Sequence, residues 1–343
     1  MMNIELSETL VNTMQEKGRM IGWARNVVSA SKDRSIVLSQ EDIEISNSIN
    51  DYIKRLDKFG SQVAGEQIAQ LVNVIVTDEV YNAPSEILDM IFDTTSYDEF
   101  DKVKVTKNIK NTLIAYESSA RTGNVKKSYV DFTKGTVKET HLQIETELKM
   151  SDLRRQGALG IAEFALMALE AFNNKKFAIV MDMIDGLITG GDNVFECTGG
   201  SLTLPGINDF TGYLNDHITE GSPLAIGLSN IIRKVYQIAN IEAKMSDEML
   251  TELNQKTYLA VKDGVSFVPI KAGKKMGDGS TLLKPDTFYG ISGKVGVMYT
   301  KGQVRTLQEV DINREVIHLK FTGMEFGVCI TDLEKIAKLF VTA

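Results

Sequence analysis

Two aspartates stand at a spacing that could support acid–base chemistry. Asp182 and Asp185 are three residues apart in a segment of helical periodicity, so both carboxylates would lie on one side of a helix. Neighbouring carboxylates can divide the roles of proton donor and acceptor when their surroundings separate their pKa values. The simpler interpretation is that both belong to the exposed side of a long helix, and the sequence favours it.

A loop rich in glycine and lysine is a candidate for phosphate binding. It covers residues 273–281, GKKMGDGST, in which glycines leave backbone N–H groups accessible and lysines supply positive charge. A Walker loop ends in Gly-Lys-Ser/Thr between a strand and a helix. Here the lysine pair precedes the wrong glycine and strands follow, so the pattern favours a flexible loop.

The other residue types that build active sites are scattered. The three histidines share no local element, and the two cysteines lack a Cys-x-x-Cys pair, which fits reduced, buried thiols. An acidic group without a histidine fits no EF-hand loop and is expected to be a solvated face. The residues considered are His141, His217, His318, Cys197, Cys329, Asp78, Glu79, Glu86, Asp89 and Asp93. The sequence therefore predicts no catalytic, cofactor-binding or metal site, and Trp23 is expected to pack in the core.

Composition is that of an ordinary globular protein. Of 343 residues, 43% are hydrophobic and 24% charged, which favours a folded chain of one elaborate domain or two. Lysine and arginine number 38 against 46 acidic residues, and a net charge of −8 weighs against a dedicated nucleic-acid binder. The start, MMNIELSETLVN, lacks a basic segment followed by an apolar run, so we expect no secretory signal and a soluble, intracellular protein.

The N-terminal part of the chain predicts two helices. Apolar residues recur at helical spacing from Leu10 to Val28 and again from Ile45 to Leu56. Gly18 and Gly22 weaken the first helix, so it needs a packing partner. That partner is either a neighbouring subunit, reached by the helices as an arm, or the body of the same chain.

A long hairpin followed by a long helix is predicted next. Residues 124–150 alternate apolar and polar side chains on either side of a turn at 133–135, and such a ribbon must rest on something to be stable. Ser151 is a candidate N-cap for a helix that runs to Ile188, with a bend at Asn173-Asn174, before Gly190-Gly191 ends it.

The remaining third predicts helices and then strands. Residues 223–239 and 248–259 have helical patterns, and 265–270 a strand pattern. Strands at 294–300 and 303–311 flank Lys301-Gly302 and are expected to form a hairpin. A third strand from Glu315 is interrupted at Gly323 and resumes to Ile330. Thr331 with Glu334 predicts a capped final helix.

Two segments of this chain resemble major capsid proteins of tailed bacteriophages. They are TDEVYNAPSEILDMIFD, residues 77–93, and DTFYGISGKVGVMYTKGQVRTLQEVDINREVIHLKFTGMEFGVCITDLEKIAKLF, residues 286–340. The resemblance implies an α+β capsid fold. Its layout would be an N-terminal helical arm at 1–60, the start of a peripheral domain at 61–123, an extended hairpin loop at 124–150, the peripheral spine helix at 151–200, an axial domain at 201–293, peripheral strands at 294–327 and a return to the axial domain at 328–343.

The implied function is a structural protein, not an enzyme, that assembles into an icosahedral shell around double-stranded DNA. The resemblance implies pentamers and hexamers of the chain, no cofactor, no membrane, no sequence-specific DNA binding, and location in the virion after synthesis in the host cytoplasm. Scaffolding, portal and decoration proteins are candidate partners. Encapsulins, which are nanocompartment shell proteins of the same fold, are the nearest alternative. An α/β enzyme acting on a phosphorylated ligand through the Gly273 loop is a more distant one.

Overall fold

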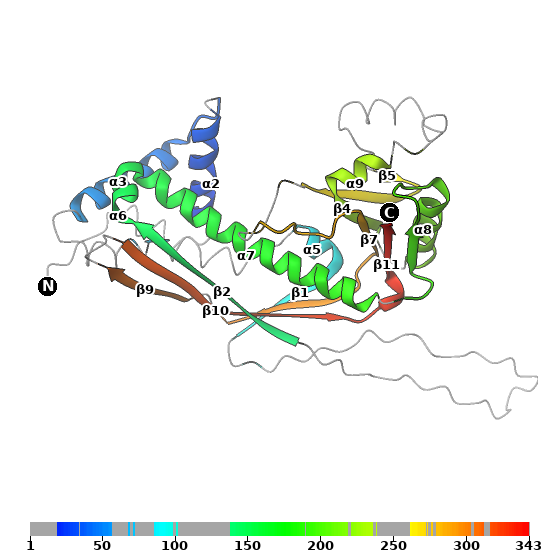
Figure 1. Ribbon diagram of the computed structural model, residues 1–343. Helices are drawn as coiled ribbons and strands as arrows, with labels where there is room; N and C mark the ends of the chain where they lie inside the picture. The colour runs from blue at the N-terminus through cyan, green and yellow to red at the C-terminus, as the bar shows by residue number, and fades with distance from the viewer. Residues whose placement is uncertain are drawn as a thin grey trace, which may run out of the picture.

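The computed structural model describes residues 19–33, 35–56, 68, 71–72, 86–98, 101, 138–188, 190–218, 221–235, 238, 261–271, 273, 276, 279–302, 305–311 and 316–342. These residues form two β-sheets joined by a long helix, α7 (Ala158–Leu187). Figure 1 shows α7 crossing the molecule from the N-terminal helices to the second sheet. No helix among them is long and apolar enough to cross a membrane.

The predicted N-terminal helices are present in the described part and pack on α7. They are α2 (Arg19–Lys32) and α3 (Gln40–Leu56). Apolar residues of both helices lie in the same core as α7, and Trp23 is fully buried with its indole N–H donating to Ser46. For these residues, the alternative of packing within the chain is therefore confirmed over that of an arm reaching a neighbour.

The long helix is confirmed, with an interruption near its start. A short α6 (Met150–Gln156) precedes α7, and the two are separated by Gly157, which has a positive φ of 59°. The helix continues without a break through Asn173 and Asn174, and Phe172, one residue earlier, lies fully buried.

The first sheet has β10 (Val316–Ile330) at its centre. One edge of β10 pairs along its length with β2 (Lys138–Lys149), and the other edge pairs first with β9 (Arg305–Asp311) and then with β8 (Gly296–Lys301). The short α5 (Glu86–Ile91) leads into β1 (Phe92–Tyr97), which pairs with β8 in parallel.

The predicted hairpin at Lys301-Gly302 is wrong. Strands β8 and β9 both run antiparallel to β10, so they follow one another in the same direction. Because β10 is 15 residues long, it offers one edge long enough for both. The interruption predicted at Gly323 does occur, as a register shift between Phe321 and Met324. The first arm of the predicted 124–150 hairpin lies outside the described residues, and its second arm is β2.

The second sheet is covered on both faces. Its strand order is β3-β11-β7-β4-β6-β5. One face, with Tyr289 and Ile291, joins the core of α7, and the other, with Phe288 and Leu339, packs on α8 (Leu204–Asp216) and α9 (Ser229–Lys234). The strands are β3 (Val194–Cys197), β4 (Pro223–Leu228), β5 (Val261–Lys262), β6 (Val265–Ile270), β7 (Thr287–Ser292) and β11 (Ile336–Val341).

Burial on both faces explains two wrong helix predictions. Residues 223–228 are all buried in β4, and the described helical part of the segment predicted from 223 to 239 is 229–234. A doubly covered strand is a continuous apolar run, which lacks the alternation that identifies a strand. The final helix predicted after Thr331 is a single 3₁₀ turn (Leu333–Lys335), and the apolar residues after it form β11. The strand predicted at 265–270 is confirmed as β6, while 248–259 lie outside the described residues.

Candidate functional site

The structure separates the two aspartates that could have formed a catalytic pair. Asp182 is exposed, as predicted. Asp185, in the last turn of α7, is mostly buried and accepts hydrogen bonds from Lys284 Nζ and Lys338 Nζ, both at 2.5 Å, and from the Tyr289 hydroxyl at 3.2 Å. The expectation of an exposed carboxylate is therefore wrong for Asp185. Its partners come from β7, β11 and the loop before β7, so Asp185 ties the end of α7 to the second sheet.

Electrostatics keep this Asp185 cluster charged. Burial acts to raise the pKa of the Asp185 carboxyl, but hydrogen bonds and charge attraction from Lys284 and Lys338 outweigh it and hold that pKa below its usual value. The hydrogen bond to Asp185 in turn raises the pKa of Lys284. Burial, with the charge of Asp185, raises the pKa of Tyr289. A carboxylate locked between two ammonium groups is a structural joint and a poor proton donor.

The glycine-rich loop does not have the setting of a phosphate site in its described residues. Met276 N–H donates to Ser280 O, and Gly279 N–H donates to Met276 O, so backbone groups that could hold a phosphate are used within the loop. The next regular element is the strand β7. A Walker loop requires a helix there, whose N-terminus faces the phosphate.

The three histidines lie apart, as expected. His141 and His318 are on the paired strands β2 and β10, where each faces a glutamate: His141 Nδ1 lies 3.4 Å from Glu325 and His318 Nδ1 lies 3.5 Å from Glu147. His217 ends α8 and stacks on Tyr213 with ring centroids 4.0 Å apart. No group of three or more histidine, cysteine, aspartate or glutamate residues in the described ranges could hold a metal ion.

The remaining candidates also have structural roles. Cys197 and Cys329 are buried free thiols, as predicted. Of the acidic group, Asp93 forms an ion pair with Lys294, which ties β1 to the chain just before β8. Asp78 and Glu79 lie outside the described residues.

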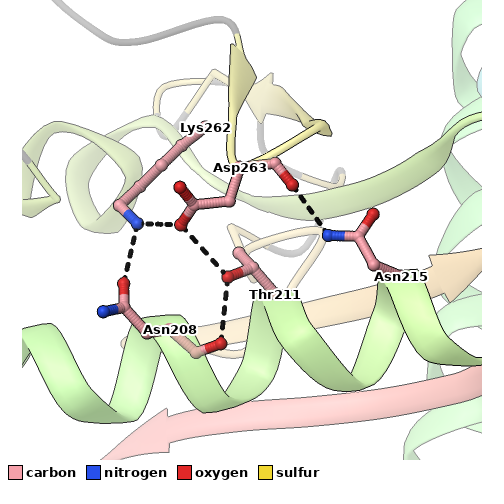
Figure 2. Close-up of polar contacts among 5 residues, drawn as sticks. All are labelled: Asn208, Thr211, Asn215, Lys262 and Asp263. Atoms are coloured by element: carbon pink, nitrogen blue, oxygen red, sulfur yellow. Dashed lines mark hydrogen bonds and ion pairs between the residues drawn. The ribbon is translucent and has the colours of Figure 1, made fainter.

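Sequence reasoning missed a polar cluster that pins the β5–β6 turn to α8. Lys262, whose side chain is nearly buried, donates to Asn208 Oδ1 at 2.9 Å and to Asp263. Asn215 donates to the backbone oxygen of Asp263 at 2.7 Å, and Thr211 lies within hydrogen-bond distance of the Asp263 carboxylate (Figure 2). The sequence signal is the pair Asp263-Gly264, both with positive φ, which is typical of a tight hairpin turn.

A buried lysine in the middle of α7 was also missed. Lys176 has 5% of its surface exposed, and burial lowers its pKa to about 8. Its neighbour on the helix, Lys175, is exposed. The signal in the sequence is the polar run Asn-Asn-Lys-Lys inside an otherwise apolar helix.

Several apolar side chains on different elements remain exposed in a single chain. Val37 and Ile36, in the connector between α2 and α3, are 89% and 42% exposed. Met167 on α7 is 62% exposed and Leu307 on β9 is 56% exposed. Hydrogen bonds flank the connector: Ser35 bonds to Asp33 on one side, and Ser39 caps α3 through Asp42 on the other. Exposed apolar residues of this kind are suited to contacts with other protein molecules.

Comparison with known proteins identifies the fold. No family model and no curated protein matches the sequence. A chain in the structure of Mycobacterium phage Bobi aligns with a TM-score of 0.51 at 10% identity, covering 76% of this chain and 91% of that chain. A chain from the capsid structure of the cyanophage P-SCSP1u gives 0.46 at 10% identity (74% and 88% covered), and one from a virus-like particle of Pyrococcus furiosus gives 0.45 at 13% identity (79% and 98% covered). The likeness to the Bobi chain confirms the α+β fold of phage proteins that the sequence resemblance implies.

Proposed function

We propose that this chain is the repeating subunit of the capsid shell of a tailed phage. The observation that carries the proposal is the fold shared with the Mycobacterium phage Bobi chain over 76% of this chain. The resemblance of residues 77–93 and 286–340 to major capsid proteins points the same way. A fold alone leaves function open, so the features of the described surface and core are the second support.

We expect the protomer to behave as one stiff body when it contacts its neighbours. Helix α7 packs on the N-terminal helices, on the first sheet through Phe164 and Phe172 against Phe321, and on the second sheet through the Asp185 cluster. A subunit that meets several neighbours at once gains from such stiffness, because no single contact must order its own segment of chain.

Assembly would proceed through many modest contacts closed by symmetry. Exposed apolar residues lie on three separate elements, at Val37, Met167 and Leu307. Each could bury a small apolar area against another copy. In a closed shell these contacts reinforce one another, so the assembly is far more stable than any isolated pair.

We assign the parts of the fold to the domains expected of a capsid subunit. The first sheet with α7 is the peripheral domain, with its strands at 294–327, and the second sheet is the axial domain, centred on 201–293 and joined by the returning segment 328–343. The end of β7 at Ser292 and the start of β8 at Gly296 support the boundary near 293. We assign residues 124–150 to the extended hairpin and 1–60 to the N-terminal helical arm, whose described helices α2 and α3 pack on α7 of the same chain. Strand β3 belongs to the second sheet, so the axial part begins a few residues before 201.

The shell would enclose double-stranded DNA without reading its sequence. The net charge of −8 supports a container that does not grip its contents tightly. We place the protein in the virion, made in the host cytoplasm, with a scaffolding protein, a portal or decoration proteins as candidate partners. We propose no enzymatic role, since the described polar clusters use their donors and acceptors within the fold.

The test is electron microscopy of the purified chain, expressed alone, with light scattering for mass. Closed shells, or rings of five or six copies, are expected. A chain that stays a monomer or dimer, alone and with the neighbouring phage genes, would overturn the proposal. Shells that contain a co-purified enzyme instead of nucleic acid would identify the encapsulin alternative. Nucleotide binding by a monomer, abolished by Gly277→Val, would support the enzyme alternative.

A further inference from the structure

Two histidines occupy matching places on the longest strand pair that the structure describes. Strands β2 and β10 pair from Val316–Lys149 to Val328–Lys138, and each histidine stands directly opposite a glutamate of the other strand. His318 faces Glu147 at 3.5 Å, and His141 faces Glu325 at 3.4 Å. One histidine comes from each strand, and the two pairs lie on opposite sides of the register shift after Phe321.

All four side chains are on one face of the sheet. His141 and Glu147 are an even number of residues apart on β2, so they point the same way, and each cross-strand partner shares its side. The opposite face carries Leu142, Ile317 and Leu319, which are buried in the core beneath α7. We call the outward face with the two pairs the ladder face. Figure 1 shows β2 lying along β10 for most of its length.

The row that contains His318 is rich in carboxylates. Glu147 lies on one side, on β2, and Glu309 occupies the register position on the other side, on β9. The next row on this face already has its own cation, because Lys320 stands between Glu145 and Leu307. With a neutral imidazole, the two carboxylates of the His318 row face no positive charge in register. With an imidazolium, that row gains a cation between two anions.

In the row that contains His141, the charge of Glu325 is partly balanced even when His141 carries no proton. Glu325 lies 3.9 Å from Lys301 of β8 as well as 3.4 Å from His141. Arg305 holds the register position opposite Thr322, between the two histidine rows, and Lys149 and Asp311 stand on either side of Val316 at the far end. A proton on His141 adds a second cation at Glu325, on the β2 side.

We propose that β2 and β10 pair more stably when His141 and His318 carry a proton. We call this proton-dependent strand pair the clasp. Histidine is the side chain whose ordinary charge change falls between pH 5 and 8. Glutamate ordinarily ionises below that range, so acidification adds attraction across the pair. Each pair is partly exposed to solvent, so each contributes a modest factor, and the two act on the same strand pair. This inference concerns the fold itself and does not depend on the capsid proposal.

Hydrogen–deuterium exchange of the full chain tests the clasp. Peptides from 138–149 and 316–322 would be followed at pH 5.5 and pH 8, after correction for the intrinsic effect of pH on amide exchange and in the same assembly state. Opening of these strands is expected to be about two- to five-fold rarer at pH 5.5. The double variant His141→Gln/His318→Gln should lose this difference.

The chain supplies a matched control. His217→Gln removes the third histidine, which stacks on Tyr213 away from both strands, and should keep the full pH effect. Exchange in peptides of β7 and β11 reports any change of global stability with pH, including the change that Lys176 causes. A native chain without extra protection at pH 5.5, or a double variant that retains it, overturns the clasp. Glu147→Gln/Glu309→Gln gives an independent arm: it should lose the share of the effect that comes from His318, and an unchanged effect would contradict the proposal.

Discussion

The side-chain oxygen of Asn50 accepts a hydrogen bond from the backbone N–H of Ala158 at 2.8 Å, across 108 positions of sequence. Ala158 is the first residue of α7, and the residue before it, Gly157, supplies no side-chain cap. Helix α3 therefore caps the longest described helix from outside. The close approach also explains Gly157, because a Cβ there would lie 2.3 Å from Asn50 Oδ1.

Replacing the external cap should weaken the whole protomer. Asn50→Ala leaves the Ala158 N–H unpaired, and we expect a loss of about 1 kcal/mol in the free energy of unfolding. Asn47→Ala, an exposed position on the same helix, is the control and should change little. Urea unfolding of both variants checks this, and equal midpoints would show that the contact contributes nothing.

Breaking the joint at the end of α7 should cost more. Asp185→Asn removes the charge that holds Lys284 and Lys338, and we expect about 2 kcal/mol of destabilisation at pH 7. Asp182→Asn, three residues earlier and exposed, is the matched control.

The same carboxylate predicts a response to acid. The pKa of Asp185 is lower in the folded chain than its ordinary value of 3.8, so its contribution is complete above that value and is lost as pH falls through the folded pKa. The gap in the free energy of unfolding between the native chain and Asp185→Asn should therefore narrow as pH falls below 3.8. A gap that stays constant from pH 6 to pH 2 would contradict this account.

The buried lysine, Lys176, predicts that stability rises with pH on the alkaline side. The pKa of Lys176 is lowered from 10.5 to about 8 in the folded chain, so between these values the unfolded chain binds more protons and stability rises with pH. The rise is at most about 3 kcal/mol, from 1.36 kcal/mol per pKa unit. Lys176→Met should remove it and Lys175→Met should not. Measurements belong below pH 10, since burial raises the pKa of Tyr52 to about 12 and ionisation of unfolded tyrosine then opposes the trend.

Two glycines should respond in opposite ways to alanine. A Cβ on Gly296 would lie 2.0 Å from the backbone oxygen of Cys329, so Gly296→Ala must push β8 from β10 and we expect aggregation or a large fall in the thermal midpoint. A Cβ on Gly186 in α7 would meet no other group within 4 Å outside the backbone of its own helix, and Gly186→Ala should stabilise the chain by about 0.5–1 kcal/mol through helix propensity. A tolerated Gly296→Ala would disprove the close approach of the two strands.

A change in the α2–α3 connector should separate assembly from folding. Val37→Asp places a charge on an exposed apolar position, so the protomer should unfold as before while the yield of closed shells falls. Asn47→Asp adds the same charge elsewhere on the helix pair and is the control. Light scattering measures the yield of shells, and unfolding curves measure the stability of the protomer. Normal shells from Val37→Asp would exclude the connector from the contacts between subunits.

Sequence patterns predicted two long elements with one covered face and missed two strands that are covered on both. Helix α7 and the strand after Glu315 have clear periodicities, because each presents one side to water. Strand β4 and the residues after Lys335 are apolar without alternation, and only the sheet around them makes them strands. The direction of β9 could not be predicted either, since it depends on the length of a partner that comes later in the chain.

The polar sites followed the same division. Exposure of Asp182 was predictable from the helix pattern, whereas Asp185 finds its partners between 99 and 153 residues later, at Lys284, Tyr289 and Lys338. No local spacing encodes such a cluster. The Lys262 cluster had one local signal, the Asp263-Gly264 turn, and its other members come from α8.

The place of β11 controls when the second sheet can be completed. It lies between β3 and β7, pairing with β3 in parallel, although β3 is the first strand of that sheet to be synthesised and β11 the last of those described. Until residues 336–341 leave the ribosome, a nascent chain therefore lacks the strand that joins the edge strand β3 to β7. A chain cut short before Ile336 would lack the strand that joins the two parts of the sheet.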